Sequence, residues 1–346
     1  MKLIRFGKRI VSSLAVAGFA AAVIVLWSPP VAAQAPIELR LSTFVPPVHI
    51  IAREIITPWI AEVEKATGGA VKPTLYPSMQ LGGSPPELIR QVKDGVVDMV
   101  FTLPGYTSPA FPRVQMIELP GLKPDGLAAT NMMWDLLDPY LLPEFQGLKV
   151  IALWGADDAG LMTRDKPIRG LDDIKGMRMR SPSAAQATQL KQMGAAPVAM
   201  PITELYPQLE RGVIDGAMVP FSVILDFRLG EVARYYTIAG PLFGRSSFLI
   251  AMNKRKYDSL PASARAAIDR LSGRQLSLKA TEVYIKRAHE GIESVRGKAE
   301  VIHFSKAEQD RISKVLAPII DEWITEQTGK GIPARAMLKR AGHPGS

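Results

Sequence analysis

Residues 87–98 read ELIRQVKDGVVD, and residues 204–215 read ELYPQLERGVID. The two stretches carry Glu, Leu, Gln, Gly, Val and Asp at matching places, and every match has the same offset of 117 positions. Each stretch predicts a helix that ends at a glycine cap and is followed by a strand. Such joints are common in α/β proteins, so a single match could arise by chance. The agreement over the whole stretch favours two lobes of similar structure.

The segments around these stretches alternate short apolar strands with amphipathic helices, which is typical of an α/β protein with mostly parallel sheets. Strands are predicted at residues 37–41, 71–76 and 97–101, and apolar residues recur at helical spacing between the first two. Two α/β lobes imply a cleft between them. Because ligands of open parallel sheets bind beyond the carboxyl ends of the strands, the segments that follow strands are the candidates for a site.

The last third of the chain is predicted to be helical. A helical pattern runs from Pro261 towards Arg296 and is long enough to cross both lobes. Ser305 opens a second amphipathic helix with a capping box, and after Gly331 we expect a frayed basic tail. The predicted organisation is a signal peptide at 1–33, lobe 1 at 36–155 with about 243–285, lobe 2 at 156–242 with about 286–332, and a tail at 333–346.

The amino terminus has the pattern of an export signal. A basic start is followed by an apolar stretch over residues 10–27 and by Ser28-Pro29-Pro30, which ends any helix. Small residues at 31–33 predict cleavage after Ala33, with cleavage after Ala35 as the alternative. A retained membrane anchor is the other interpretation, because the apolar stretch is close to a spanning length. We expect a periplasmic protein.

Composition excludes several classes of protein and partner. The chain has no cysteine, so it forms no disulfide and carries no lipid anchor on cysteine. Four basic residues of the predicted signal contribute to the net charge of +9, which leaves +5 for the remainder. The basic residues form no long run, so no nucleic-acid partner is expected.

The motifs of common exported enzymes are missing. The histidines His49, His289, His303 and His343 include no pair at metal-binding spacing, so neither a metal nor another cofactor is expected. The chain has no Gly-x-Ser-x-Gly elbow, no Ser-x-x-Lys motif and no phosphate-binding loop. A hydrolase with paired carboxylates stays open, since its acids leave little trace in a sequence.

One group of residues is suited to binding an anion. Residues 176–180, GMRMR, alternate as a strand that places Arg178 and Arg180 on the same face, and Ser183 then caps a helix. A guanidinium offers two parallel hydrogen bonds to a carboxylate, and the free amides of a helix start add positive charge. The alternative is that both arginines are solvated or paired with acids such as Asp172 or Asp173.

The stretch PIRGLDDIKGMRMR at residues 167–180 carries a resemblance to a known family, together with MGAAPV at 193–198, DGVVD at 94–98 and ELP at 118–120. With these motifs the chain resembles the periplasmic solute-binding subunits of tripartite ATP-independent periplasmic (TRAP) transporters over about residues 37–333. The resemblance implies a two-lobed α/β fold with crossing strands, a long spanning helix and a ligand cleft between the lobes. It also implies a receptor of small organic acids that works as a monomer and delivers its ligand to integral membrane subunits, with Arg180 pairing to the ligand carboxylate.

Two departures from the family pattern narrow the expected ligand. Val219 stands before Pro220 where many members carry asparagine, and residues 156–158 read Ala-Asp-Asp where many carry a second arginine. We therefore expect a monocarboxylate with an apolar or aromatic body. The predicted ligand-binding residues are Arg180, Phe44, His49, Thr102, Tyr106, Trp154, Asp157, Met218 and Phe221.

Several alternatives to this interpretation stay open. The aromatic residues among the predicted site residues are equally suited to the core, and His49 is equally suited to a surface loop. A periplasmic hydrolase or lyase that acts on a small organic acid is the alternative function. A receptor for another type of importer, or a ligand-binding partner of a sensor, would use the same fold.

Overall fold

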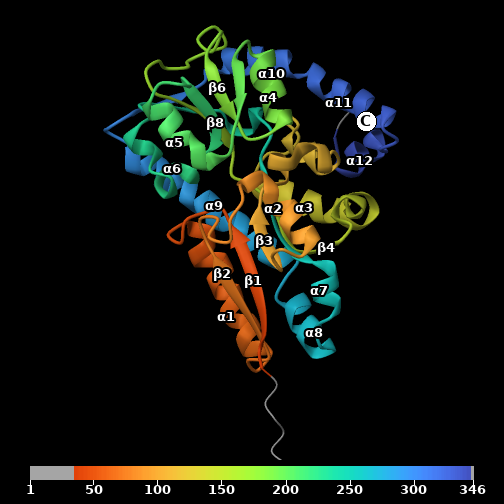
Figure 1. The fold of residues 1–346 in the computed structure, drawn as a ribbon. Coiled ribbons are helices and arrows are strands. Elements are labelled where there is room, and N and C mark those ends of the chain that lie inside the picture. The colour runs from red at the N-terminus through yellow and green to blue at the C-terminus, as the bar shows by residue number, and fades with distance from the viewer. Residues whose placement is uncertain (1–34, 344–346) are drawn as a thin grey trace, which may run out of the picture. The chain divides into compact units, whose positions relative to one another are not determined.

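The structure is a computed structural model that describes residues 35–343, and the predicted signal peptide lies outside the described residues. The described chain forms two β-sheets with helices around them (Figure 1). The five-stranded sheet has the order β2-β1-β3-β10-β4 and consists of β1 (Ile37–Thr43), β2 (Val71–Tyr76), β3 (Met99–Thr102), β4 (Leu148–Gly155) and β10 (Ser247–Asn253). The six-stranded sheet has the order β11-β9-β5-β8-β6-β7 and consists of β5 (Ala159–Thr163), β6 (Arg178–Ser181), β7 (Ala196–Ala199), β8 (Gly216–Pro220), β9 (Tyr235–Ile238) and β11 (Glu300–His303).

The helices connect and cover these strands. The α-helices are α1 (Thr57–Ala66), α2 (Leu88–Asp94), α3 (Gly126–Leu136), α4 (Ala184–Gln192), α5 (Ile202–Glu210), α6 (Val223–Asp226), α7 (Lys254–Asp258), α8 (Ala262–Arg270), α9 (Arg274–Val295), α10 (Lys306–Leu316), α11 (Pro318–Gly329) and α12 (Ala334–Arg340). Short 3-10 or π turns are η1 (Ala52–Ile56), η2 (Pro85–Glu87), η3 (Pro104–Ala110), η4 (Val114–Glu118), η5 (Leu137–Leu141), η6 (Leu142–Phe145), η7 (Leu229–Glu231) and η8 (Gly240–Leu242). Within residues 35–343, no helix is both long and apolar enough to cross a membrane.

The predicted similarity of the two lobes is visible in the pairing of the strands. β1 lies between β2 and β3 with both neighbours parallel, and β6 lies in the same way between β7 and β8. The aspartates at the ends of the two matching stretches make the same contacts. The amide of Arg40 donates to Asp98 Oδ2 at 2.8 Å, and the amide of Arg178 donates to Asp215 Oδ2 at 2.7 Å. The repeated sequence therefore marks a repeated structural unit.

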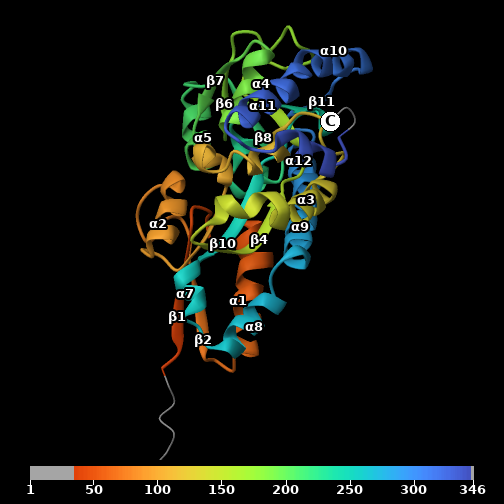
Figure 2. The ribbon, with the colours of Figure 1, turned by 90° about the vertical axis from the view of Figure 1, so that its right-hand side faces the viewer.

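The sheets are mixed rather than mostly parallel, which corrects one detail of the prediction. β10 runs antiparallel to β3 and β4, and β5 runs antiparallel to β8 and β9. Both strands directly follow a place where the chain passes from one sheet to the other, at residues 156–158 and 239–246. Each enters its new sheet against the direction of its neighbours. Figure 2 shows β10 beside β4.

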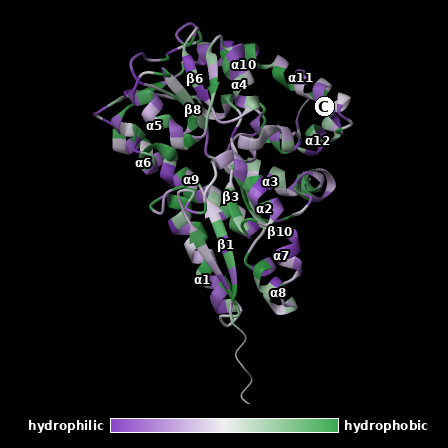
Figure 3. Ribbon diagram, viewed as in Figure 1, coloured by the Kyte–Doolittle hydropathy of each residue, from purple (hydrophilic) through white to green (hydrophobic). Residues whose placement is uncertain are grey.

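Burial follows the periodicity expected from the sequence. In β1 the alternate residues Leu39 and Leu41 have no exposed surface, and in α1 Trp59 and Val63 point inward one helical turn apart. Figure 3 shows hydrophobic residues along β1 and a mixture of hydrophobic and hydrophilic residues on α1. Burial of these apolar faces against each other holds the helices on the sheets.

The predicted spanning helix is real but shorter than expected. The pattern from Pro261 onwards is divided into α8 and α9 at Gly273, which has a φ of 88° and donates its amide to Ile151 O at 2.7 Å. A residue at this φ leaves the helical path, so the strut is α9 alone. α9 packs against α3 and β4 beside the five-stranded sheet and against α6 beside the six-stranded sheet. Figures 1 and 2 both draw it between the two sheets.

The expected frayed tail was wrong for residues 334–340. These residues form α12, in which Met337 and Leu338 have no exposed surface. Both side chains belong to the buried apolar cluster of the protein, and α12 packs against α3 and α11. The basic residues Lys339 and Arg340 are the exposed face of an amphipathic helix, which the charge of this segment concealed.

Candidate ligand-binding site

A pocket between the two sheets receives side chains from both of them. It is lined by Phe44, His49, Leu103, Tyr106, Arg180, Pro182, Ile202, Pro220, Val223, Phe227, Ser246, Phe248 and Tyr284. Its cavity volume is only about 20 Å³, because the lining side chains lie close together. Much of the lining belongs to the carboxyl ends of β1, β3, β6 and β8 or follows them, as expected for parallel strands.

Four other hollows are larger, with volumes of about 270 to 500 Å³, but their chemistry differs. The two largest lie against α10 and α11, and none of the four has an arginine in its lining. The smaller pocket between the sheets is the one that combines a buried cation with aromatic walls. We therefore regard it as the candidate site.

Arg180 is the charged group of this pocket. It lies in β6, is 2 % exposed, and donates through Nε to Met200 O at 3.0 Å and through Nη1 to Met218 O at 3.4 Å. Within residues 35–343 no carboxylate lies within ion-pair distance of its guanidinium. Burial lowers the pKa of Arg180, although an arginine keeps its charge at neutral pH. A buried charge without a counter-ion is unfavourable, so this guanidinium is suited to an anionic ligand.

Arg178, the other arginine on this face of β6, has the opposite environment. Its side chain is 48 % exposed, and Nη2 lies 2.6 Å from Asp215 Oδ1. Asp172, one of the acids considered as a partner for the two arginines, pairs instead with Lys175 and Arg311. Arg178 is therefore already neutralised, whereas Arg180 is not.

Aromatic side chains lie beside Arg180. The Tyr106 hydroxyl accepts a hydrogen bond from the Ile202 amide at 2.9 Å and is attracted to the Arg180 guanidinium. Burial raises the pKa of Tyr106, so the phenol stays protonated and can donate to a ligand. Phe44 packs edge-on against Tyr106 with ring centroids 5.6 Å apart. The charged end of the pocket thus adjoins an aromatic wall.

His49 lies in the wall of the pocket rather than on the surface. It is 2 % exposed, and its Nδ1 accepts from the Ile51 amide at 3.2 Å, which leaves the proton of the neutral ring on Nε2. Burial lowers the pKa of His49 to about 4, against the opposing attraction of Asp226, so the ring is neutral at pH 7. Nε2 lies 3.9 Å from Asp226 Oδ2, which is longer than a hydrogen bond.

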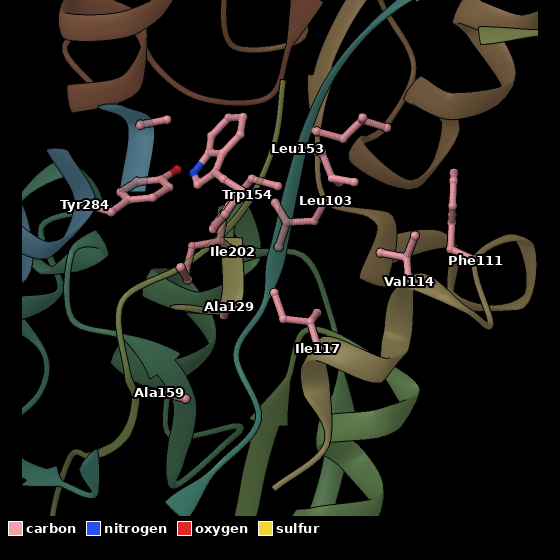
Figure 4. Close-up of a cluster of buried hydrophobic side chains, with 14 of the residues drawn as sticks. Leu103, Phe111, Val114, Ile117, Ala129, Leu153, Trp154, Ala159, Ile202 and Tyr284 are labelled. Carbon is pink, nitrogen blue, oxygen red and sulfur yellow. The ribbon is translucent and has the colours of Figure 1, made fainter. Parts of the chain in front are cut away.

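Four of the predicted site residues line the pocket, and five do not. Arg180, Phe44, His49 and Tyr106 are brought together, whereas Thr102, Trp154, Asp157, Met218 and Phe221 are buried behind the lining. Trp154, which Figure 4 shows in the buried hydrophobic cluster, has no exposed surface. Its ring stacks on that of Phe101 with centroids 5.6 Å apart. Phe221 packs around Gly160, where an added Cβ would meet the ring at 2.3 Å. The ligand-binding roles of all nine residues remain predictions.

The remaining members of this second group have contacts of their own. The Asp157 carboxylate accepts from the Ser222 amide at 3.2 Å, and burial raises its pKa to about 7. Met218 contributes its carbonyl to Arg180, while its side chain is in the core. Thr102 is fully buried on the last position of β3. These three residues support the pocket from behind.

Sequence reasoning missed the lining residues Phe227, Phe248 and Tyr284. Phe248 lies in β10, which enters its sheet from the other lobe, and Tyr284 lies in the middle of α9. Because a helix that spans both lobes must pass the cleft, an aromatic residue at its centre, Tyr284, could have been predicted as a lining residue. The sequence has no comparable feature that indicates Phe227. Among residues 35–343, no group of three acidic or histidine side chains is arranged to hold a metal ion.

Comparison with known proteins gives a consistent result over nearly the whole described chain. The family model for bacterial extracellular solute-binding proteins of family 7 (DctP) matches residues 41–327. A solute-binding protein of Verminephrobacter eiseniae is 26 % identical over 83 % of this chain and 84 % of its own length. The C4-dicarboxylate-binding periplasmic protein of Rhodobacter capsulatus is 26 % identical over 75 % of this chain and 78 % of its own length.

Two solved structures are similar throughout. A TRAP solute-binding protein from Rhodoferax ferrireducens in complex with copurified benzoate has a TM-score of 0.85 and 32 % identity, and the match covers 88 % of this chain and 96 % of the other. A marine metagenome TRAP solute-binding protein specific for aromatic acid ligands, in complex with 3-hydroxybenzoate, has a TM-score of 0.85 and 28 % identity, with 89 % and 97 % covered.

Proposed function

Because the chain belongs to the bacterial extracellular solute-binding proteins of family 7, as the periplasmic solute-binding subunit of a TRAP transporter, we propose that its ligand is a small organic monocarboxylate with an apolar or aromatic body. The family consists of transport receptors and not of enzymes, so the hydrolase or lyase alternative is not pursued. The chain binds a small molecule and delivers it to membrane subunits, and the organic-acid class of that molecule is the proposal.

The observation that carries the proposal is the buried, uncompensated charge of Arg180. Its two protein partners are backbone carbonyls, which solvate the guanidinium but do not neutralise it. A ligand carboxylate would neutralise it and accept charge-assisted hydrogen bonds, which are among the strongest in proteins. Tyr106, beside it, supplies a further donor.

A single carboxylate suits this pocket better than two. Arg245 is also buried, but it pairs with Asp158 and donates to the carbonyls of Lys123 and Pro124, so its charge is already used. His49 is neutral, and behind it lies the acidic Asp226. A second carboxylate would therefore find no free cation among the described lining residues, and the aromatic walls favour an apolar body.

The relatives support an aromatic acid in particular. The two similar structures hold benzoate and 3-hydroxybenzoate. The Rhodobacter capsulatus relative is named for C4-dicarboxylates, so the family as a whole does not decide the ligand. The proposed ligand class therefore rests on the pocket of this chain, where Arg180 is the one unpaired cation among the described lining residues and aromatic side chains form the walls.

The mechanism we propose is closure of two lobes around the ligand. The lobes are assigned to residues 36–155 with about 243–285 and to 156–242 with about 286–332. Arg180 and Val223 approach the ligand from one side and Phe44 and Tyr106 from the other, so a ligand that touches both sides favours the closed state by its differential affinity. We propose that the receptor acts as a monomer.

A thermal-shift screen of the protein against benzoate, 3-hydroxybenzoate and succinate tests this function. Binding to the folded state stabilises it by about 2.7 kcal/mol at a ligand concentration of 100 times Kd, so true ligands raise Tm. We expect a rise with the aromatic acids, none with succinate, and recovery of the unchanged acid from the complex. A rise with succinate alone would refute the monocarboxylate, and no rise with any acid would refute the carboxylate premise.

A further inference from the structure

We propose that Tyr284 and His49 form a second polar subsite in the pocket, which binds an uncharged hydroxyl group on the body of the ligand. The inference rests on the proposed function, because the subsite is meaningful only when a carboxylate is held at Arg180. It makes the expected ligand a hydroxylated aromatic monocarboxylate. Nothing in the family match assigns a role to either residue.

The hydroxyl group of Tyr284 belongs to the lining of the pocket and has no hydrogen-bond partner in the described chain. Tyr284 is 1 % exposed and lines the pocket, and within residues 35–343 its hydroxyl makes no hydrogen bond. Burial raises the pKa of Tyr284 well above its usual value, so the phenol is protonated and can both donate and accept. The hydroxyl is therefore available to a polar group of a ligand.

The position of the Tyr284 ring is fixed by its neighbours. Its centroid lies 4.8 Å from that of Phe248 and 6.2 Å from that of Trp154 (Figure 4). The ring also packs edge-on against His49, with centroids 6.1 Å apart. Because α9 contacts elements of both lobes, the hydroxyl is placed on the element that is common to them. A fixed donor loses little entropy on binding, so it discriminates well.

His49 supplies the complementary donor. Its Nδ1 is occupied by the Ile51 amide, so Nε2–H is the free donor, and the nearest acid oxygen lies beyond hydrogen-bond distance. The Asp226 carboxylate behind it is already bound by Arg287 and by the Ile50 amide at 3.0 Å. The charge of Asp226 is therefore compensated within the protein, so this part of the pocket suits an uncharged ligand group.

These two residues together fit a hydroxyl better than other groups. His49 Nε2–H can only donate, and the Tyr284 phenol can accept in return. A ligand group that accepts from one residue and donates to the other satisfies both, and a hydroxyl does so. A purely apolar ring would leave both polar groups buried and unpaired, at a cost in affinity.

Calorimetric titration of two pairs of acids tests the subsite: benzoate against 3-hydroxybenzoate, and phenylacetate against mandelate. In the wild-type protein we expect the hydroxylated member of at least one pair to bind about tenfold more tightly. Tyr284→Phe should remove most of that preference while the affinity for the unsubstituted acid stays within about twofold. Tyr236→Phe is the matched control, because it removes the hydroxyl of another buried tyrosine that does not line the pocket.

The outcomes separate the subsite from the proposed function. If both members of each pair bind equally in the wild type, or if the preference survives in Tyr284→Phe, the subsite is refuted while the receptor function stands. If no acid of either pair binds, the proposed function fails and the subsite fails with it. If Tyr236→Phe loses the preference as well, the effect is not local to the pocket and the subsite is refuted.

Discussion

Glu118 is a buried acid at the junction between the segments of the two sheets. It ends η4, is 1 % exposed, and accepts a hydrogen bond from the Ser183 hydroxyl, which also caps α4. Its backbone carbonyl accepts from Gln189 Nε2 at 2.8 Å. Burial raises the pKa of Glu118 from 4.5 to about 7. A carboxyl in this state couples the stability of the junction to pH.

The pH dependence has a defined sign. Because the pKa is higher in the folded state, the folded protein binds this proton more tightly, and the stabilisation present below about pH 4.5 is lost as the pH rises through about 7. The Glu118→Gln variant has no carboxyl group at this position, so its stability does not depend on this protonation. Urea unfolding at pH 5 and pH 8 should show the wild type losing up to about 3 kcal/mol relative to Glu118→Gln. A difference between the two proteins that stays constant with pH would contradict the assignment.

Gly244 marks a close approach of backbone to backbone. A Cβ added there would lie 1.7 Å from the carbonyl oxygen of Glu118, which has no freedom to move away. Gly244→Ala should therefore lower the free energy of unfolding by about 3 kcal/mol, as measured by denaturant unfolding. Gly329→Ala is the control: its Cβ would meet nothing within 4 Å and would lie in a helix, so stability should stay the same or rise. Equal losses in the two variants would refute this account.

Single site residues could be predicted from the sequence only where their chemistry is unusual. Charged residues at the end of a strand marked Arg178 and Arg180 together as candidates, and only the family resemblance favoured Arg180, which is the one that lines the pocket. Trp154 and Phe221 follow or end strands too, but an aromatic ring is equally at home in the core, and both lie there. The twist of the strands determines which of two neighbouring rings faces a cleft. A local sequence pattern does not predict this twist.

At the scale of elements, a buried ion pair connects α9 to α6, and a hydrogen bond to the same acid adds the segment after β1. Arg287 of α9 pairs with Asp226 of α6, and Asp226 also accepts from the Ile50 amide. The Asp226 side chain is 1 % exposed, so removing its partner leaves an uncompensated buried charge. Three segments that are distant in the sequence meet at this one carboxylate.

Arg287→Gln should lower the free energy of unfolding by about 2–3 kcal/mol, because breaking a buried pair costs far more than the pair itself gains. The matched control is Arg296→Gln, near the end of the same helix, whose pair with Glu293 is exposed. That control should unfold almost as the wild type does. Thermal or denaturant unfolding of the three proteins measures the difference. Similar behaviour of the two variants would show that the Arg287 pair is no tie between elements.

The boundaries of helices were predictable where a single capping residue sets them. They were less predictable where tertiary packing sets them. Capping by Ser183 and Ser305 fixes the starts of α4 and α10 as expected. The break at Gly273 was hidden, because a glycine within a helical pattern is often tolerated. α12 was missed because its three buried apolar residues, Ala334, Met337 and Leu338, are too few for a visible period.

At the scale of the whole described chain, the two sheets repeat one unit of three parallel strands, and each adds an antiparallel strand that directly follows a crossing of the chain from the other sheet. The repeated sequence revealed the unit but not the directions of β5 and β10, since strand direction depends on where the chain crosses. The pocket lies where these two crossings and α9 meet. The division into lobes that we propose therefore rests on topology rather than on any motif.

The central claim is that Arg180 holds the carboxylate of the ligand between these lobes. Calorimetric titration of benzoate into the wild type, Arg180→Ala and Arg178→Ala tests it most directly, because the two arginines lie on one face of one strand but differ in burial and pairing. We predict one site per chain, an affinity within about threefold of the wild type for Arg178→Ala, and a loss of about 100-fold for Arg180→Ala. Wild-type affinity in Arg180→Ala would contradict the claim.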